Sequence, residues 1–449
     1  MTSGGLPRSR SIDSRSYGLS PSKAVTSDLS ARKRRSSRGR DEPGSFALTK
    51  VTSNSIKELP RGTKPIRFIG EGAANAVFEI QVPVTDESAT QFKGLLLRVA
   101  KVPQRGQKST YDYLFQQSFF EKSILPVLGK YAVHQEMVGL RHHDIFEEMN
   151  NLLASLDVKR KKKFRGSFIG ESEFGLLVED MTAKDSDHFT VEFKPKWLAQ
   201  SPSAPANAIR CRQCALELRY FITNPSGDRS LPIDKPCPLT LCDDGGAASA
   251  ASPFRLAPGL ATSPAREYIA KRLVNITKQP IMKELRRQQM LHDTTGPLTA
   301  DPKDANFALA MTIRDCTCFA QISLRPSVEI EEGPLKLRFG DLDWKNPANK
   351  ISHWRGLEAA LINDGFYTAN RIQFRGDYYN VPTLCALEMS SDCRPPATSV
   401  LQVDEEGKPQ RQTRSVSAQG VHYIRTADVD EFAHRLLALK DRAVTTQSR

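Results

Sequence analysis

The chain has 449 residues, 39% of them hydrophobic, and a formal net charge of +13 at neutral pH. This length supports two domains or lobes, and the lack of any run of about 18 apolar residues argues against a membrane-spanning helix. The charge favours a polyanionic partner, which leaves nucleic acid, an anionic membrane surface or a multiply phosphorylated small molecule. No apolar signal segment opens the chain, so we expect an intracellular protein in the nucleus and/or the cytoplasm.

Residues 1–55 are rich in Ser, Arg, Gly and Pro, a composition that predicts a disordered basic tail. Residues 1–45 hold ten Lys/Arg and four Asp/Glu, so a net charge of about +6 lies there and about +7 in the rest. The cluster 31-ARKRRSSRGR-40 is typical of a nuclear-import signal, but a solvated basic tail explains it equally well.

Ordered structure is predicted from 65-PIRFIGEGAANAVFEIQV-82 onward, where apolar runs flank a glycine turn, and 95-LLLRVAKV-102 adds a third strand. Such a turn can bring backbone N–H groups close to phosphates, although a plain β-hairpin gives the same pattern. Asn75 stands where a kinase loop has its third glycine. On the third strand, Arg98 and Lys101 would point to opposite faces, so only one of them could reach a nucleotide.

The middle of the chain predicts two helices and a connecting strand. Apolar spacing indicates helices over 111–129 and 144–156, and 174–181 is typical of a buried strand that joins a small sheet lobe to a larger one. The run 159-KRKKKFR-165 has six cations in seven residues, which favours a solvated linker over a binding surface.

Two carboxylate sites lie 26 residues apart in the C-terminal half. Asp315 precedes an alternating strand, a turn is predicted at 331–334, and the strand 335–341 ends in 341-DLD-343. A β-hairpin would therefore bring both sites to one edge of a cleft. Phosphoryl transfer to a hydroxyl uses such a pair, one carboxylate to orient the hydroxyl and one to hold Mg²⁺. The order matches a protein kinase, although HRD and DFG are absent and an isolated Asp at a strand end often caps a turn.

The eight cysteines are expected to be mostly reduced thiols, with Cys316 and Cys318 in the core. The pair 211-CRQC-214 followed by Cys237 and Cys242 is compatible with a structural zinc site, but the four-residue gap in the second pair favours unpaired thiols.

The stretch 191-VEFKPKW-197 places two lysines around a proline. In extended geometry Lys194 and Lys196 would point to the same side, while the aromatic residues of the stretch anchor the opposite face. The alternative is an edge strand with exposed lysines and a charge-balancing Glu192.

Several stretches together resemble the inositol-pentakisphosphate 2-kinase family, in a fungal-looking form, from about residue 65 to about 370. They are 70-GEGAANAVFEI-80, 96-LLRVAK-101, 125-LPVLGKYAVHQEMVGL-140, 191-VEFKPKW-197, 314-RDCTCF-319 and 340-GDLDWK-345. The resemblance implies an α+β, two-lobed, protein-kinase-like fold with a small N-terminal antiparallel sheet lobe (56–181) and a larger mixed C-terminal lobe (182–449). It also implies transfer of the ATP γ-phosphate to the 2-hydroxyl of inositol 1,3,4,5,6-pentakisphosphate, which forms inositol hexakisphosphate (phytate), with ATP and Mg²⁺ as cofactors.

The resemblance also implies roles for individual residues. Catalytic residues would be Asp315 and Lys194, and the metal ligands Asp341 and Asp343. Nucleotide contacts would come from Gly70, Glu71, Gly72, Ala73, Ala74, Asn75, Arg98, Glu179, Met181, Arg286 and Asp341. Substrate contacts would come from Lys194, Lys196, Arg219, Lys345, Lys350 and Trp354, with Arg160 or Arg165 as a further contact that the sequence leaves open. The zinc site of plant members has no matching Cys/His set between residues 286 and 315.

Two other functions compete with this one. A catalytically inactive kinase-like scaffold would not need both Asp315 and Asp341. A nucleic-acid-binding protein would interleave aromatic and basic residues, whereas the aromatic residues here follow core-like patterns. We expect inositol pentakisphosphate and ATP as partners, no membrane, no specific nucleic acid, and a monomer. Surface insertions are predicted at 221–265 and 393–420, and an amphipathic helix at 426–443.

Overall fold

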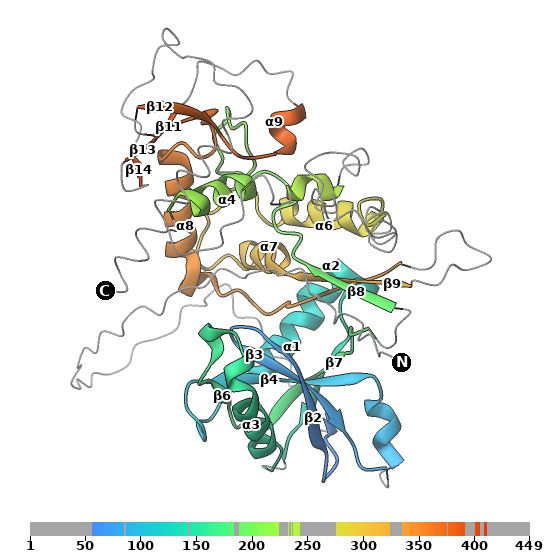
Figure 1. The fold of residues 1–449 in the computed structure, drawn as a ribbon. Coiled ribbons are helices and arrows are strands. Elements are labelled where there is room, and N and C mark those ends of the chain that lie inside the picture. Colours follow the sequence, from blue (N-terminus) through green and yellow to red (C-terminus); the bar gives the residue numbers. More distant parts are fainter. Residues whose placement is uncertain are drawn as a thin grey trace, which may run out of the picture. The chain divides into compact units, whose positions relative to one another are not determined.

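The structure is a computed structural model (Figure 1). It describes residues 56–84, 87–141, 144–183, 188–223, 232, 235, 237–242, 275–323, 335–374, 376–390, 400–404 and 408–410. The basic tail, the turn at 331–334 and the helix at 426–443 lie outside the described residues, as do most of the two expected insertions. Within the described part, no helix is both long enough and apolar enough to cross a bilayer.

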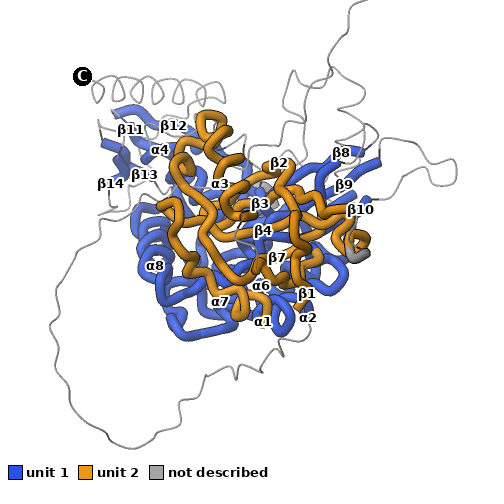
Figure 2. The backbone as a smooth tube through the Cα atoms, turned by 90° about the horizontal axis from the view of Figure 1, so that it is seen from below, with its two compact units in different colours: residues 1–12, 119–133, 181–449 blue, residues 13–118, 134–180 orange. Residues whose placement is uncertain are grey.

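The described residues form a mixed α/β protein with three sheets, and the chain divides into two compact units (Figure 2). Unit 2 holds the described residues before 119 and residues 134–180, whereas unit 1 holds 119–133 and the described residues from 181 on. Each unit has its own hydrophobic core.

Unit 2 is built on a seven-stranded sheet in the order β1-β5-β7-β4-β3-β2, with β6 paired to β4. The strands are β1 (Lys57–Glu58), β2 (Lys64–Glu71), β3 (Asn75–Gln81), β4 (Leu95–Val102), β5 (Gln135–Gly139), β6 (Phe168–Ile169) and β7 (Phe174–Glu179). The helical segments are η2 (Glu87–Phe92), α1 (Tyr113–Phe119), α3 (Asp144–Leu156), η5 (Asp157–Lys159) and η6 (Lys162–Phe164). The pairing is antiparallel except between β1 and β5.

The predicted strand, glycine turn, strand, strand order is confirmed by β2, β3 and β4. Buried side chains of these strands meet the apolar face of α3, because Phe78, Leu97 and Met149 are each inaccessible to solvent. The helix expected over 144–156 is also confirmed. Burial of this apolar surface is the main force that holds the sheet and the helix together.

Unit 1 centres on a three-stranded antiparallel sheet in the order β10-β9-β8. Its elements are η3 (Phe120–Ile124), α2 (Leu125–Leu128), η4 (Gly129–Tyr131), β8 (His188–Phe193), α6 (Pro280–Leu291), α7 (Ala305–Asp315), β9 (Thr317–Ser323) and β10 (Leu335–Gly340). The first two continue α1, so the predicted helix over 111–129 is confirmed, and it ends at Gly129 with a φ of 49°.

The predicted hairpin is confirmed, because β9 and β10 pair in register from Thr317 opposite Gly340 to Ile322 opposite Leu335. Alternate residues of β9 are buried, and Cys316 and Cys318 are both in the core as expected. Pairing of Thr317 with Gly340 places the hairpin ends side by side, so residues 315 and 341 flank the same end of the sheet. The sequence interpretation did not foresee α7, which begins at the capping side chain of Asp304.

A second core in unit 1 lies beneath a four-stranded sheet in the order β12-β11-β13-β14. The remaining elements of unit 1 are α4 (Arg212–Thr223), η8 (Pro238–Cys242), α8 (Pro347–Asn363), β11 (Arg371–Phe374), β12 (Asp377–Asn380), α9 (Ala386–Ser390), β13 (Val400–Val403) and β14 (Pro409–Gln410). Figure 1 shows α4 beside α8, next to this sheet.

Candidate active site

Three ammonium groups gather around the Asp315 carboxylate at the end of the β9–β10 hairpin. Lys196 Nζ lies 3.0 Å and Lys194 Nζ 3.4 Å from Asp315 Oδ1, and Lys345 Nζ lies 3.2 Å from Oδ2. Lys194 Nζ also lies 2.7 Å from Asp341 Oδ2. We call these five residues the lysine–aspartate cluster. The structure therefore brings together residues that are as much as 151 positions apart, from Lys194 to Lys345.

Each acidic residue of the cluster is fixed by the end of a secondary-structure element. Asp315 is the last residue of α7, and Asp341 follows β10 directly. Asp341 has a φ of 57°, in the left-handed region that Asp and Asn tolerate better than most residues. Both carboxylates keep 44% of their side-chain surface exposed, so they remain accessible to a ligand.

Lys196 reaches Asp315 by a turn and not by extended geometry, so the predicted route was wrong. Strand β8 ends at Phe193, and Lys196 has a φ of 58°. A left-handed conformation is unfavourable by about 1–2 kcal/mol for a residue with a side chain. The buried Gln289 side chain holds the turn, because its amide donates to the Lys196 carbonyl (2.9 Å) and accepts from the Leu198 N–H (2.9 Å).

Trp197 anchors this turn in the core, as the sequence predicted. Its side chain is buried, and two guanidinium groups lie over its ring, that of Arg314 at 3.6 Å and that of Arg212 at 4.3 Å from the centroid. Such cation–π contacts are strongest where water is excluded. Because Arg314 directly precedes Asp315, one short segment supplies both the ring contact and the acid of the cluster.

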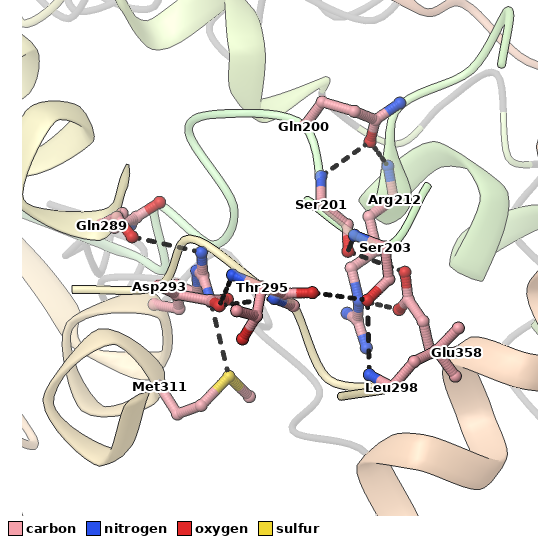
Figure 3. Close-up of polar contacts among 12 residues, drawn as sticks. Gln200, Ser201, Ser203, Arg212, Gln289, Asp293, Thr295, Leu298, Met311 and Glu358 are labelled. Atoms are coloured by element: carbon pink, nitrogen blue, oxygen red, sulfur yellow. Dashed lines mark hydrogen bonds and ion pairs between the residues drawn. The ribbon is translucent and has the colours of Figure 1, made fainter. Parts of the chain in front are cut away.

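Each of these arginines has a buried carboxylate partner, and Figure 3 shows Arg212 with Glu358. Arg314 pairs with Asp293, and Arg212 pairs with Glu358 at 2.6 Å. Glu358 also accepts hydrogen bonds from Ser201 Oγ and Tyr367 Oη, both at 2.7 Å. The sequence interpretation missed all these partners, since no local pattern links them. Of the residues in this network, only Arg314 stood in a stretch that the sequence interpretation used, because it directly precedes Asp315 in 314-RDCTCF-319.

The charges of the cluster shift one another's proton affinities. Burial alone would raise the pKa of Asp315, but attraction to Lys196, Lys345 and Lys194 outweighs it and holds the pKa below its usual range. Burial alone would lower the pKa of Lys345, but Asp341 and Asp315 outweigh that effect and raise it. At neutral pH the acid is therefore ionised and the lysine protonated.

Helix α8 adds Lys350, a cation whose charge acts on the cluster. Burial, followed by repulsion from Lys345, lowers the pKa of Lys350. Burial also lowers the pKa of His353, with further repulsion from Arg212, Lys350 and Arg219. Lys350 and Arg219, both expected substrate contacts, thus act electrostatically on this imidazole.

Trp354, another expected substrate contact, packs edge-on against Phe307 with ring centroids 5.7 Å apart. It covers the core that contains Trp197, so its observed contacts stabilise the support of the cluster.

In unit 2, the glycine turn between β2 and β3 is closed by the Gly72 N–H, which donates to the Asn75 carbonyl at 2.8 Å. A side chain at Gly70 or Gly72 would meet no atom within 4 Å, and neither residue has a positive φ. The fold of the turn therefore does not require glycine there. The open space is suited to a ligand that approaches the backbone closely.

Glu71 of the turn forms buried ion pairs with Lys101 and Arg160, each at 2.7 Å. Burial would raise the Glu71 pKa, but hydrogen bonds from Arg160 and Lys101 lower it below its usual value. The Lys101 ammonium also lies 4.0 Å from the Phe164 ring centre.

The linker interpretation of 159–165 is wrong for Arg160, which is buried within unit 2. Arg165 donates to the carbonyls of Arg160 and Val158.

The other expected site residues lie on several elements. Ala73 and Ala74 are exposed in the glycine turn, Arg98 is half-buried in β4, Arg286 is exposed on α6, and Asp343 is half-buried after β10. The Glu179 N–H donates to the His134 carbonyl, and the Met181 carbonyl accepts from Thr190 Oγ1.

The chain matches the family model described as inositol-pentakisphosphate 2-kinase over residues 68–252 and 253–360, which is more than half of its length. It belongs to the inositol-pentakisphosphate 2-kinase family. A relative named inositol-pentakisphosphate 2-kinase, from Yarrowia lipolytica, is 26% identical over 333 residues, which cover 70% of this chain and 96% of the relative. The predicted resemblance is confirmed, and it places the chain among the inositol phosphate kinases. The matched residues include the glycine turn and the whole lysine–aspartate cluster.

Because the Arg314–Asp293 pair is buried, its loss should destabilise the protein far more than the loss of an exposed ion pair. Replacing Asp293 by Asn keeps an oxygen for the Gly296 N–H but leaves the buried Arg314 without a counter-charge. We expect a loss of about 3–5 kcal/mol in the free energy of unfolding, measured by urea titration. Glu284→Gln, which removes the exposed ion pair with Arg287, should leave the midpoint of the urea unfolding transition nearly unchanged. Equal shifts in both variants would contradict this account of the network.

Proposed function

We propose that this protein is an ATP-dependent kinase that transfers the γ-phosphate to the 2-hydroxyl of inositol 1,3,4,5,6-pentakisphosphate and so forms inositol hexakisphosphate. The observation that carries the proposal is the convergence of three lysine ammonium groups on Asp315, beside Asp341, in a member of this family. We further propose that unit 2 is the small lobe and unit 1 the large lobe of a protein-kinase-like fold.

The substrate's charge matches the cations of the cluster. Five phosphates carry about −1.5 to −2 each, so the substrate carries about −8 to −10 near neutral pH. Lys194, Lys196 and Lys345 have side chains that are only 12%, 25% and 14% exposed. Their ammonium groups are thus already positioned and partly desolvated, and exchange of carboxylate for phosphate oxygens would order few further torsions.

Asp315 would orient the hydroxyl that attacks. Its depressed pKa keeps it an ionised hydrogen-bond acceptor, and such a carboxylate can hold a hydroxyl in line for transfer. Pairing of the lysines with substrate phosphates would weaken the attraction that depresses this pKa. Substrate binding would thereby make Asp315 more basic at the point where the hydroxyl proton must be accepted.

The oxygen donors after β10 fit a magnesium ion. Asp341 and Asp343 are two residues apart, and hard carboxylate oxygens are the ligands that Mg²⁺ prefers. When bound, the ion would neutralise charge on the nucleotide phosphates. Lys194, which now pairs with Asp341, would be released toward a phosphate. The nucleotide phosphates would lie against the open backbone of Gly70 and Gly72, with Arg98 as a further contact.

The test is incubation of the purified protein with ATP, Mg²⁺ and a panel of inositol phosphates, with products resolved by ring position. We expect phosphate to appear on the 2-position of the pentakisphosphate. Turnover of ATP with phosphate placed at another ring position would overturn the proposed substrate, and no turnover of any inositol phosphate would favour the scaffold function.

The proposed roles predict the behaviour of two variants. Asp315→Ala and Asp341→Ala should each lower kcat by about 10²–10⁴-fold, as expected for loss of a positioned acid–base or metal-binding group. Neither should unfold the protein, as judged by circular dichroism and thermal melting. The exposed Asp301, replaced by Ala, serves as the matched control and should keep full activity. Full turnover by either cluster variant would refute its assigned role.

A further inference from the structure

A second group of reactive side chains lies in unit 1, outside the lysine–aspartate cluster. Four cysteines, Cys211, Cys214, Cys237 and Cys385, have sulfur atoms within 4.8 Å of one another. All four side chains are buried, the most exposed at 6%. They come from three separate segments. Cys211 directly precedes α4 and Cys214 lies in its first turn, whereas Cys237 directly precedes η8 and Cys385 directly precedes α9.

The spacing of the sulfurs is that of metal ligands and not of a disulfide. Cys237 Sγ lies 3.9 Å from Cys211 Sγ and 3.9 Å from Cys385 Sγ. Zinc–thiolate bonds of about 2.3 Å at tetrahedral angles place two sulfurs about 3.8 Å apart. A disulfide would require about 2.05 Å. These two separations agree with the tetrahedral zinc geometry, and all four sulfurs lie within 4.8 Å of one another.

Backbone N–H groups surround the sulfurs as they would surround thiolates. The Cys211 N–H donates to Cys385 Sγ at 3.2 Å, and the N–H groups of Cys214 and Ala386 donate to Cys211 Sγ and Cys237 Sγ, both at 3.5 Å. Hydrogen bonds to an ionised acceptor are stronger than those to a neutral one, so three donors favour charged sulfurs. Hydrogen bonds of this kind around the ligands orient them toward a metal.

A fully buried cation adjoins the group. Arg210, next to Cys211, is inaccessible to solvent and donates to Thr383 Oγ1 (2.8 Å) and to the carbonyls of Phe366 (3.1 Å) and Ala369 (2.7 Å). Four thiolates around a divalent ion carry a net charge of −2, which this guanidinium, shared with the Glu388 carboxylate at 3.7 Å, offsets in part.

We propose that these four cysteines bind one Zn²⁺ ion as a closed, structural Cys₄ site. Protein sulfur fills all four tetrahedral positions and leaves none for water or substrate, which distinguishes a structural site from a catalytic one. The sequence interpretation considered Cys242 as the fourth ligand of such a site but favoured unpaired thiols. The structure replaces Cys242 with Cys385, because the Cys242 thiol contacts the Met282 carbonyl at 3.2 Å.

The ion would cross-link segments that are far apart in the chain. Cys237 and Cys385 are separated by 148 positions, and binding energy at such a site is folding energy. Cys211 is followed directly by Arg212, whose guanidinium lies over the Trp197 ring. The site would therefore fasten the start of α4 beside the network that holds Lys196 in place.

The test is the metal content of the full chain, purified reduced and without chelators, by mass spectrometry of the metal. We expect about one zinc per chain. Cys237→Ser and Cys385→Ser should each reduce the zinc content more than about tenfold. Cys242→Ser, which changes a buried cysteine outside the group, should leave the zinc content unchanged.

The wild-type protein gives a second readout in case the serine variants fail to fold. Exchange with Co²⁺ should produce the intense visible bands of tetrahedral thiolate coordination. A reduced wild-type protein that takes up no zinc, a disulfide between any two of the four cysteines, or equal zinc in Cys385→Ser and Cys242→Ser would each overturn the proposal.

Discussion

The placement of Lys196 depends on one buried arrangement, the Trp197 ring beneath the guanidinium groups of Arg212 and Arg314. Each arginine is buried and has its own carboxylate partner. Buried ion pairs contribute little net stability, because desolvation offsets their attraction. Their contribution here is geometric, since they fix the ring from which the lysine turn projects. Gln289 then closes that turn from the other side.

The buried ring arrangement also positions the lysine–aspartate cluster, because Arg314 and Asp315 are adjacent in the chain. Arg314 points into the core and contacts the ring, while its neighbour Asp315 receives three ammonium groups at the surface. The β9–β10 pairing then sets Asp341 beside Asp315. A single helix end, one hairpin and one left-handed turn thus determine where the charges of the cluster lie. A ligand that replaces the carboxylates as partner of the lysines meets cations whose positions were fixed during folding.

Much of this could be predicted from the sequence, because its signals are local. Alternation of apolar residues predicted the β9–β10 hairpin. The glycine turn with its flanking apolar runs predicted β2, β3 and β4. The left-handed turn at Lys196 could not be predicted, since it depends on Gln289, 93 positions away. Cys385 and Asp293 were missed for the same reason, because each meets its partners only through tertiary packing.

The central claim is that placed cations, and not net charge, select the substrate. Calorimetric titration of inositol pentakisphosphate into wild-type protein, Lys194→Ala and the exposed-lysine control Lys130→Ala tests it most directly. Both variants lose one positive charge. The account predicts at least a tenfold rise in Kd for Lys194→Ala, about 1.4 kcal/mol, and none for Lys130→Ala. Equal weakening in the two variants would contradict it.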